Sequence, residues 1–246
     1  MNGTNHRSLT ISGLDNDILR YITERDIQPG ERIPSLGELS KELRVGIGKL
    51  REQLEVAREM GIVEVRPKIG VTVKEYSFMP AVRWSLVYAL ARNHADFEDF
   101  SNLRNHVEFA YFFEAVAQLV EEDHAALREI VREAWAKLGA DPIRIPHAEH
   151  RALHITIFSR LQNPFVTGIL ESYWEAYEAV GLSVYSDYEY LREVWRYHEG
   201  VVNNIIKGDN DEAYRLLVEH SRLLQHHGNL TKTSPRKRRD AEKDDK

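Results

Sequence analysis

The chain has 246 residues, of which 42% are hydrophobic and 29% charged, and its formal net charge at pH 7 is −6. This length and composition fit one large or two modest globular domains, and they exclude a collagen-like or largely disordered chain. The lack of cysteine excludes disulfides, thiolate metal sites and cysteine nucleophiles, so a transition metal would need imidazole and carboxylate ligands.

No apolar run approaches the roughly 20 residues that a membrane span requires, and the amino terminus MNGTNHRSLTISG lacks the apolar core of a signal peptide. We therefore expect a cytoplasmic protein without a membrane partner. Because the net charge is negative, contact with a nucleic acid requires a local basic surface rather than the field of the whole molecule.

The first third of the chain predicts three short helices and a hairpin. Apolar residues recur at helical spacing over residues 14–26, and a Pro-Gly pair follows as a breaker. Ser35 with Glu38 three positions later is typical of a capping box, which starts a second helix. A third helix is indicated over residues 47–60, and two β-branched runs within residues 62–76 predict a hairpin.

Three helices with a tight turn between the second and third, closed by a hairpin, are typical of a winged helix-turn-helix, a small α/β domain that we assign to residues 10–75. The third helix and the hairpin are locally basic. Two stretches, 44–51 leading into the third helix and 65–74 in the hairpin, hold six basic residues and no acidic residue: Arg44, Lys49, Arg51, Arg66, Lys68 and Lys74. Charges solvated on a small domain are the alternative, but their concentration favours DNA contact, for which we select Lys49, Arg51, Arg66 and Lys68.

The rest of the chain predicts an all-α bundle. After a linker at residues 76–80, about seven segments with helical periodicity fill residues 81–228, separated by short breaks. Residues 229–246 mix both charges at high density and are expected to be disordered. The fold class expected for the whole chain is therefore mostly α, with a small α/β domain first.

Four histidines form a candidate metal site in this bundle. His150 and His154 are four residues apart in a helix-patterned run, so both imidazoles project from one face. Taken alone, this pair is more often solvated or hydrogen-bonded than metal-bound. His198 and His220 lie in two further helix-patterned segments, and imidazoles from facing helices can enclose a divalent ion.

Several motifs occur together in a recognisable order. The amino-terminal part contains PGERIPSLGELSKEL and LREQLEVAREMGIVEVRPKIGVTV, and the later part contains HRALHITIFSRLQNP. Single residues complete the pattern: Leu103, Arg104, Glu108, His198, Gly208, Asp209 and His220. Over residues 10–227 the chain resembles the GntR family of bacterial transcription regulators, in the FadR-like branch that carries an FCD effector domain.

The resemblance implies a DNA-binding regulator that acts as a homodimer on a palindromic operator in double-stranded DNA. It implies a small carboxylate effector near Arg104, above a metal held by the four histidines His150, His154, His198 and His220. In the amino-terminal domain, Arg51 matches a DNA-contacting position of the family and Gly70 matches its wing glycine.

Two departures from the family pattern bear on these expectations. His150 stands where this branch usually has aspartate, and an all-imidazole set suits zinc or nickel better than magnesium, calcium or manganese. In the DNA-reading segment, Gly37 and Ile47 replace basic residues and Gly46 replaces a serine. Because bidentate arginine reads guanine, these changes predict an altered operator preference.

Two rival functions remain open at this point. A metal-dependent enzyme would need a general base, but Arg151 follows His150, so the HExxH pattern is missing, and no GxSxG or phosphate-loop motif is present. We therefore expect no enzymatic activity. The second rival is a regulator whose metal is purely structural or absent.

Overall fold

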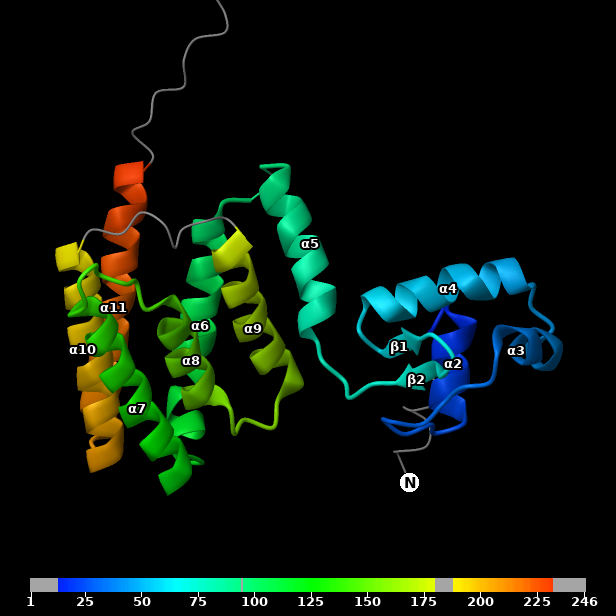
Figure 1. The fold of residues 1–246 in the computed structure, drawn as a ribbon, viewed down its shortest axis with the longest axis horizontal. Coiled ribbons are helices and arrows are strands. Elements are labelled where there is room, and N and C mark those ends of the chain that lie inside the picture. Colours follow the sequence, from blue (N-terminus) through cyan, green and yellow to red (C-terminus); the bar gives the residue numbers. More distant parts are fainter. Residues whose placement is uncertain (1–12, 94, 180–187, 232–246) are drawn as a thin grey trace, which may run out of the picture. The chain divides into compact units, whose positions relative to one another are not determined.

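The computed structural model describes residues 13–93, 95–179 and 188–231 (Figure 1). The described residues are mainly helical with one two-stranded sheet, which confirms the predicted mostly α fold class. They form two compact units. One contains the residues up to Arg92 together with Gln162–Ala176, and the other contains Asn93–Leu161 together with the residues from Tyr177 onward. The predicted domain boundaries stay a prediction, and residues 232–246 of the predicted tail lie outside the described residues.

From residue 13 onward, the described part of the first unit begins with three helices: α2 (Asp17–Glu24), α3 (Leu36–Leu43) and α4 (Ile47–Glu59). The Asn16 side chain accepts hydrogen bonds from the backbone amides of Ile18 and Leu19 in the first turn of α2, which fixes the start of that helix. Helix α3 begins at the predicted capping box, in which the Glu38 amide donates to Ser35 and the Ser35 amide donates to Glu38. Arg44 ends α3 in a left-handed conformation, at φ 56°, and the chain turns there into α4.

The hairpin of β1 (Val63–Arg66) and β2 (Gly70–Val73) closes this domain in antiparallel register, with Val63 opposite Val73. Helix α4 packs against α2, α3 and β1. Their apolar faces share one core, built from Ile18, Tyr21, Ile22, Ile33, Leu39, Leu50, Leu54, Ala57, Val63 and Val73. The three helices and the hairpin therefore form the winged helix-turn-helix arrangement that the sequence predicts.

Helix α5 (Met79–Ala91) and most of α9 (Pro164–Ala179) complete the first unit. The Ser172 hydroxyl lies 3.3 Å from the Met79 carbonyl oxygen, to which it donates. Gly168 allows the two helices to meet, since a Cβ at this position would lie 2.7 Å from the Cβ of Phe78. Residues far apart in the sequence thus pack closely at the start of α5.

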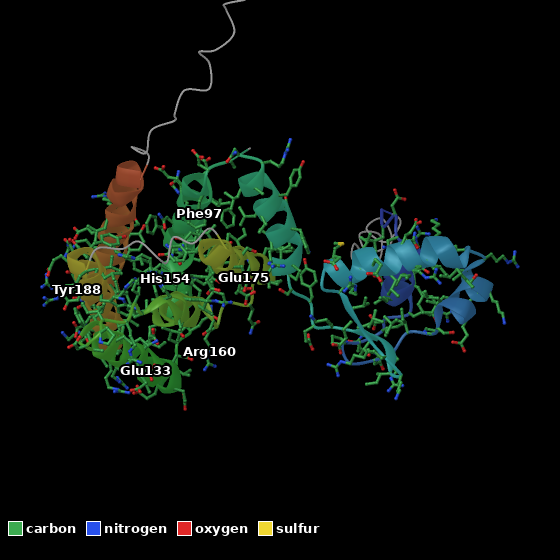
Figure 2. All side chains as sticks on the ribbon, turned by 45° about the horizontal axis from the view of Figure 1, so that its top comes forward. Phe97, Glu133, His154, Arg160, Glu175 and Tyr188 are labelled. Atoms are coloured by element: carbon green, nitrogen blue, oxygen red, sulfur yellow. The ribbon has the colours of Figure 1, made fainter. Side chains whose placement is uncertain are left out.

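In the described residues the second unit is built from five helices: α6 (Phe97–Val116), α7 (Glu121–Leu138), α8 (His147–Phe158), α10 (Tyr188–Lys207) and α11 (Asn210–Thr231). Helix α10 packs against α11 and α7, while α8 packs against α7 and α6. Figure 2 shows the bundle filled with side chains, with His154 inside it and Glu133 on its outer side. Within the described residues, seven helices follow the hairpin, as predicted, and none of these is long and apolar enough to cross a membrane.

Candidate metal centre and nucleic-acid interface

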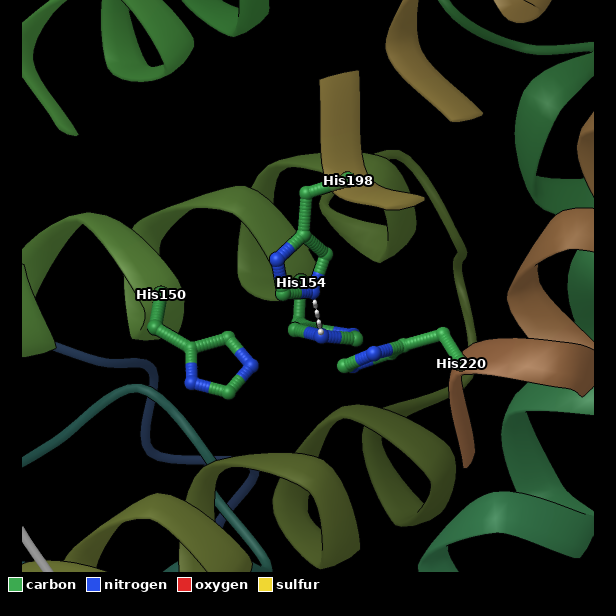
Figure 3. Close-up of side chains that lie close together, drawn as sticks. All are labelled: His150, His154, His198 and His220. Atoms are coloured by element: carbon green, nitrogen blue, oxygen red, sulfur yellow. Dashed lines mark hydrogen bonds between the residues drawn. The ribbon is translucent and has the colours of Figure 1, made fainter. Parts of the chain in front are cut away.

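The structure brings all four predicted histidines together in the interior of the second unit (Figure 3). His150 and His154 project from successive turns of α8, His198 comes from α10 and His220 from α11. Each side chain is buried. One ring nitrogen from each residue belongs to a set in which all members lie within 4.8 Å of one another. We call these four residues the histidine cluster.

The spacing inside the histidine cluster fits a small metal ion. His154 Nε2 and His198 Nε2 are 3.2 Å apart. Two nitrogens bound to one tetrahedral zinc at about 2.0–2.1 Å would be about 3.3 Å apart. The other two ligand nitrogens of the cluster lie within 4.8 Å of these two and of each other.

Burial keeps the imidazoles of the histidine cluster in the form that binds metals. It lowers the pKa values of His150, His154 and His198 well below 6.5, and that of His220 to about 3. Charge on Arg104 acts in the same direction on all four. Neutral imidazole carries the lone pair that a metal requires, so no proton has to be removed near neutral pH.

Hydrogen bonding within the cluster also points to a ligand. His198 Nδ1 and both ring nitrogens of His220 are buried, and no hydrogen-bond partner for them occurs in the described parts of the chain. A buried polar atom without a partner destabilises the fold by about 1–3 kcal/mol. A divalent cation would take one lone pair from each ring, including one of the two His220 nitrogens, so the donor set fits a metal.

Glu108 of α6 orients one member of the cluster. Its Oε1 lies 3.0 Å from His154 Nδ1 and 3.1 Å from Arg104 Nε, and both Glu108 and Arg104 are only 1% exposed. A carboxylate accepts the Nδ1 proton, and this tautomer directs the lone pair of Nε2 towards His198. Burial raises the pKa of the Glu108 carboxyl, while the Arg104 guanidinium opposes that shift.

Arg104 therefore lies beside the histidine cluster, but it is already engaged within the protein. Besides its ion pair with Glu108, its Nη1 donates to Asn105 Oδ1 at 2.9 Å. Its role in holding an effector stays a prediction. The orienting role of Glu108 is not part of the sequence prediction, although its spacing of four from Arg104 indicates an ion pair along one helix face.

Aromatic rings flank the cluster. The centroid of Trp195 lies 5.0 Å from that of His198 and 6.3 Å from that of His150, and Tyr177 lies 6.4 Å from His150. These rings exclude water and strengthen electrostatic interactions at the site. Trp195 was missed by the sequence reasoning, although its position three residues before His198 on α10 places both on one helix face.

The predicted DNA-contacting residues are all exposed on the first unit. Lys49 and Arg51 lie on α4, and Lys49 Nζ is 2.9 Å from Asp17 Oδ2 of α2. On the hairpin, Arg66 pairs with a glutamate of its own strand, at 3.1 Å. Lys68 has φ 66° in the turn, and Gly70 has φ 103°, which favours glycine. Their contact with DNA remains a prediction.

Comparison with known proteins decides the family. The FCD domain matches residues 99–223, which include the histidine cluster, Arg104 and Glu108. The chain belongs to the FadR-like branch of the GntR family. This result confirms the resemblance drawn from the motifs, and it identifies a family of transcription regulators rather than of enzymes.

Individual relatives of this GntR member agree with that assignment. The HTH-type transcriptional regulator LutR of Bacillus subtilis is 22% identical over 208 residues, covering 81% of this chain and 92% of LutR. The uncharacterised HTH-type transcriptional regulator YieP of Escherichia coli is 24% identical over 221 residues, covering 82% and 88%. The structure of Streptococcus agalactiae GntR matches with a TM-score of 0.61 and 20% identity, over 85% of this chain and 96% of that one, so the fold is shared.

Proposed function

We propose that this transcriptional regulator of the GntR family binds a palindromic operator as a homodimer, and that a small carboxylate controls its operator affinity at a metal-containing pocket of the FCD domain. The observation that carries this proposal is the histidine cluster, four buried neutral imidazoles from three helices with their nitrogens within 4.8 Å. Such a constellation is costly to maintain in a core unless a ligand uses it.

The donor set favours zinc or nickel. Imidazole suits the later first-row metals, whereas magnesium, calcium and manganese prefer oxygen ligands. When bound, the metal would supply a Lewis-acidic centre that attracts a carboxylate oxygen. His150, where the family usually has aspartate, makes the set all nitrogen, and the charge of a bound divalent ion would then be balanced by other groups, Glu108 and an anionic effector among them.

Arg104 is the proposed carboxylate contact. Its planar fork matches a carboxylate in a bidentate arrangement. Because Arg104 already pairs with Glu108, an incoming carboxylate has to share the guanidinium with it. Effector binding would thereby act on the same charge that orients His154 through Glu108.

A second candidate is a metal with a purely structural role, and the number of ligands favours it. Four imidazoles complete a tetrahedral zinc site, and closed sites of this kind are structural. A carboxylate oxygen could then bind the metal only as a fifth or sixth ligand. Nickel, which accepts higher coordination, would leave room for the effector.

DNA binding is proposed for the exposed basic residues of α4 and the hairpin, with Arg51 central. A two-fold dimer would place its two α4 helices in neighbouring major grooves of an inverted repeat. An effector changes operator affinity only as far as it binds one dimer geometry better than the other, and a tenfold change requires about 1.4 kcal/mol of differential binding.

The test combines metal analysis, thermal unfolding and operator binding. Chelator-treated protein is reloaded with zinc or nickel and screened with small carboxylic acids, because specific stabilisation reports a bound ligand. We expect one metal per chain, lost in His198→Ala and retained in His106→Ala, which removes an exposed histidine of α6. We also expect at least one acid to raise Tm and change operator affinity only in the metal-loaded protein.

The outcomes separate the two candidates. Unchanged metal content and ligand affinity in His198→Ala would remove the metal from the proposed mechanism. If metal binds but no carboxylic acid changes Tm or operator affinity in the zinc-loaded or the nickel-loaded protein, the structural role is favoured. Operator binding that does not weaken as the salt concentration rises would contradict DNA recognition through the basic residues.

A further inference from the structure

The first turn of α4 has a composition that its own domain does not explain. Ile47, the first residue of the helix, is 45% exposed, whereas Leu50, Leu54 and Ala57 are buried in the core; Val56, further along the helix, is the other exposed apolar residue, at 52%. A large β-branched side chain is thus held at the surface at the beginning of the helix. It adds nothing to the core of the winged domain.

Two glycines flank this isoleucine without a structural need for glycine. Gly46 has φ −61° and ψ 140°, which any residue adopts, and it provides no side-chain cap for α4. A Cβ added to Gly46 or Gly48 would meet no atom within 4 Å. Glycine inside a helix, as at Gly48, weakens that helix relative to alanine. By contrast, Gly168 is required because a Cβ there would collide with Phe78.

The position of this turn suggests what approaches it. Ile47 and its two flanking glycines lie directly before Lys49 and Arg51. In helix-turn-helix proteins the amino-terminal residues of the second helix of the motif, which is α4 here, contact base edges in the major groove. The stretch from Val45 to Gly48 carries no charged or hydrogen-bonding side chain. Among the groups that base pairs present in the major groove, the 5-methyl group of thymine is the apolar one.

We propose that the first turn of α4 approaches the major groove with its backbone close to the DNA, and that Ile47 packs against the 5-methyl group of a thymine in each half-site. Because Gly46 and Gly48 have no side chains, no atoms beside Ile47 would hold the backbone away from the DNA. The inference rests on the proposed DNA-binding function and adds the chemical feature that the protein reads.

The first experiment removes the methyl group alone. The full-length protein selects duplexes from a random pool, and each thymine of the selected operator is then replaced in turn by deoxyuridine. At one thymine per half-site we expect about a fourfold loss of affinity, and about 16-fold when both half-sites are changed, as for burial of one methyl-sized group. Ile47→Ala is expected to be insensitive to that replacement. Val56→Ala, which shortens another exposed apolar residue of α4, should keep the full sensitivity.

The second experiment tests the close approach. Gly48→Ala should raise the Tm of the protein, because alanine favours the helix and meets no neighbour. The same variant should bind the selected operator at least tenfold more weakly. A merely structural role of Gly48 would change stability and binding in the same direction, so opposite signs are diagnostic.

Each outcome decides a different point. If no duplex is selected, the DNA-binding proposal itself fails. If duplexes are selected but deoxyuridine has no effect, or has the same effect on Ile47→Ala as on the unaltered protein, the thymine contact is wrong while DNA binding stands. Unimpaired operator binding by Gly48→Ala would overturn the close approach.

Discussion

Replacing Glu108 by leucine should damage both the stability of the second unit and its affinity for metal, and the two effects can be separated. In the native protein the Glu108 carboxylate pairs with Arg104 at 3.1 Å and lies 3.0 Å from His154 Nδ1, with both Glu108 and Arg104 1% exposed. Glu108→Leu leaves the guanidinium buried without this counter-charge. Breaking a buried pair from one side destabilises a protein by about 3–5 kcal/mol.

Metal affinity should fall for a different reason. Without Glu108, His154 Nδ1 has lost the acceptor that selects its tautomer, and loss of such an orienting partner lowers metal affinity about 10- to 100-fold. In the double variant Arg104→Met with Glu108→Leu, an apolar pair replaces the ion pair. Because such replacements are often neutral, we expect most of the stability to return. The loss of metal affinity should persist.

Urea unfolding of the metal-free protein measures the first effect, and competition with a chelator of known affinity measures the second. Glu114→Leu, at an exposed position of the same helix α6, is the matched control and should change neither quantity. Native metal affinity in the double variant would refute the idea that Glu108 orients His154. Native stability in Glu108→Leu would show that the carboxylate does not balance the guanidinium charge.

Three further outcomes follow from the structure. The metal-free protein should lose stability as the pH falls below about 6.5, because burial lowers the folded pKa values of the histidine cluster and the unfolded chain then binds more protons. Urea denaturation at pH 7.5 and at pH 5.5 measures this change. Equal free energies of unfolding at the two pH values would contradict it. Arg51→Ala should abolish operator binding without unfolding, whereas Lys49→Ala should have a smaller effect because DNA competes with Asp17 for Lys49; binding isotherms at two salt concentrations compare them. Gly168→Ala should lower Tm, because its Cβ would lie 2.7 Å from that of Phe78, and an unchanged Tm would mean that α5 and α9 separate readily.

Features that depend on neighbouring residues could be predicted well from the sequence. The capping box at Ser35 and Glu38 forms as predicted, because its hydrogen bonds join residues three apart. The helical periodicity of residues 121–138 coincides with α7, since the alternation of buried and exposed faces follows from the helix geometry alone. The two β-branched runs around the turn at Lys68 likewise form the predicted hairpin.

The complete histidine cluster could not be predicted from neighbouring residues alone. Spacing alone puts His150 and His154 on one face of α8, but the inclusion of His198 and His220 rested on the resemblance to the family. Their nitrogens converge because α10 packs against α11, and that packing depends on side chains spread over the whole unit. The period of apolar residues indicates which face of a helix is apolar, but it does not indicate which other helix packs against that face.

The sequence by itself determined the order of the helices, the winged domain, the basic surface residues and the placement of His150 and His154 on one helix face, because these follow from local hydrogen bonding, helical period and residue chemistry. Tertiary structure alone decided that Glu108 holds His154 across 46 residues of chain, that Asp17 already engages Lys49, and that residues 162–176 pack with the first unit. Each of these is a contact between segments distant in the sequence. Such contacts are selected by the packing of complete faces, so no short stretch of residues contains the information that specifies them.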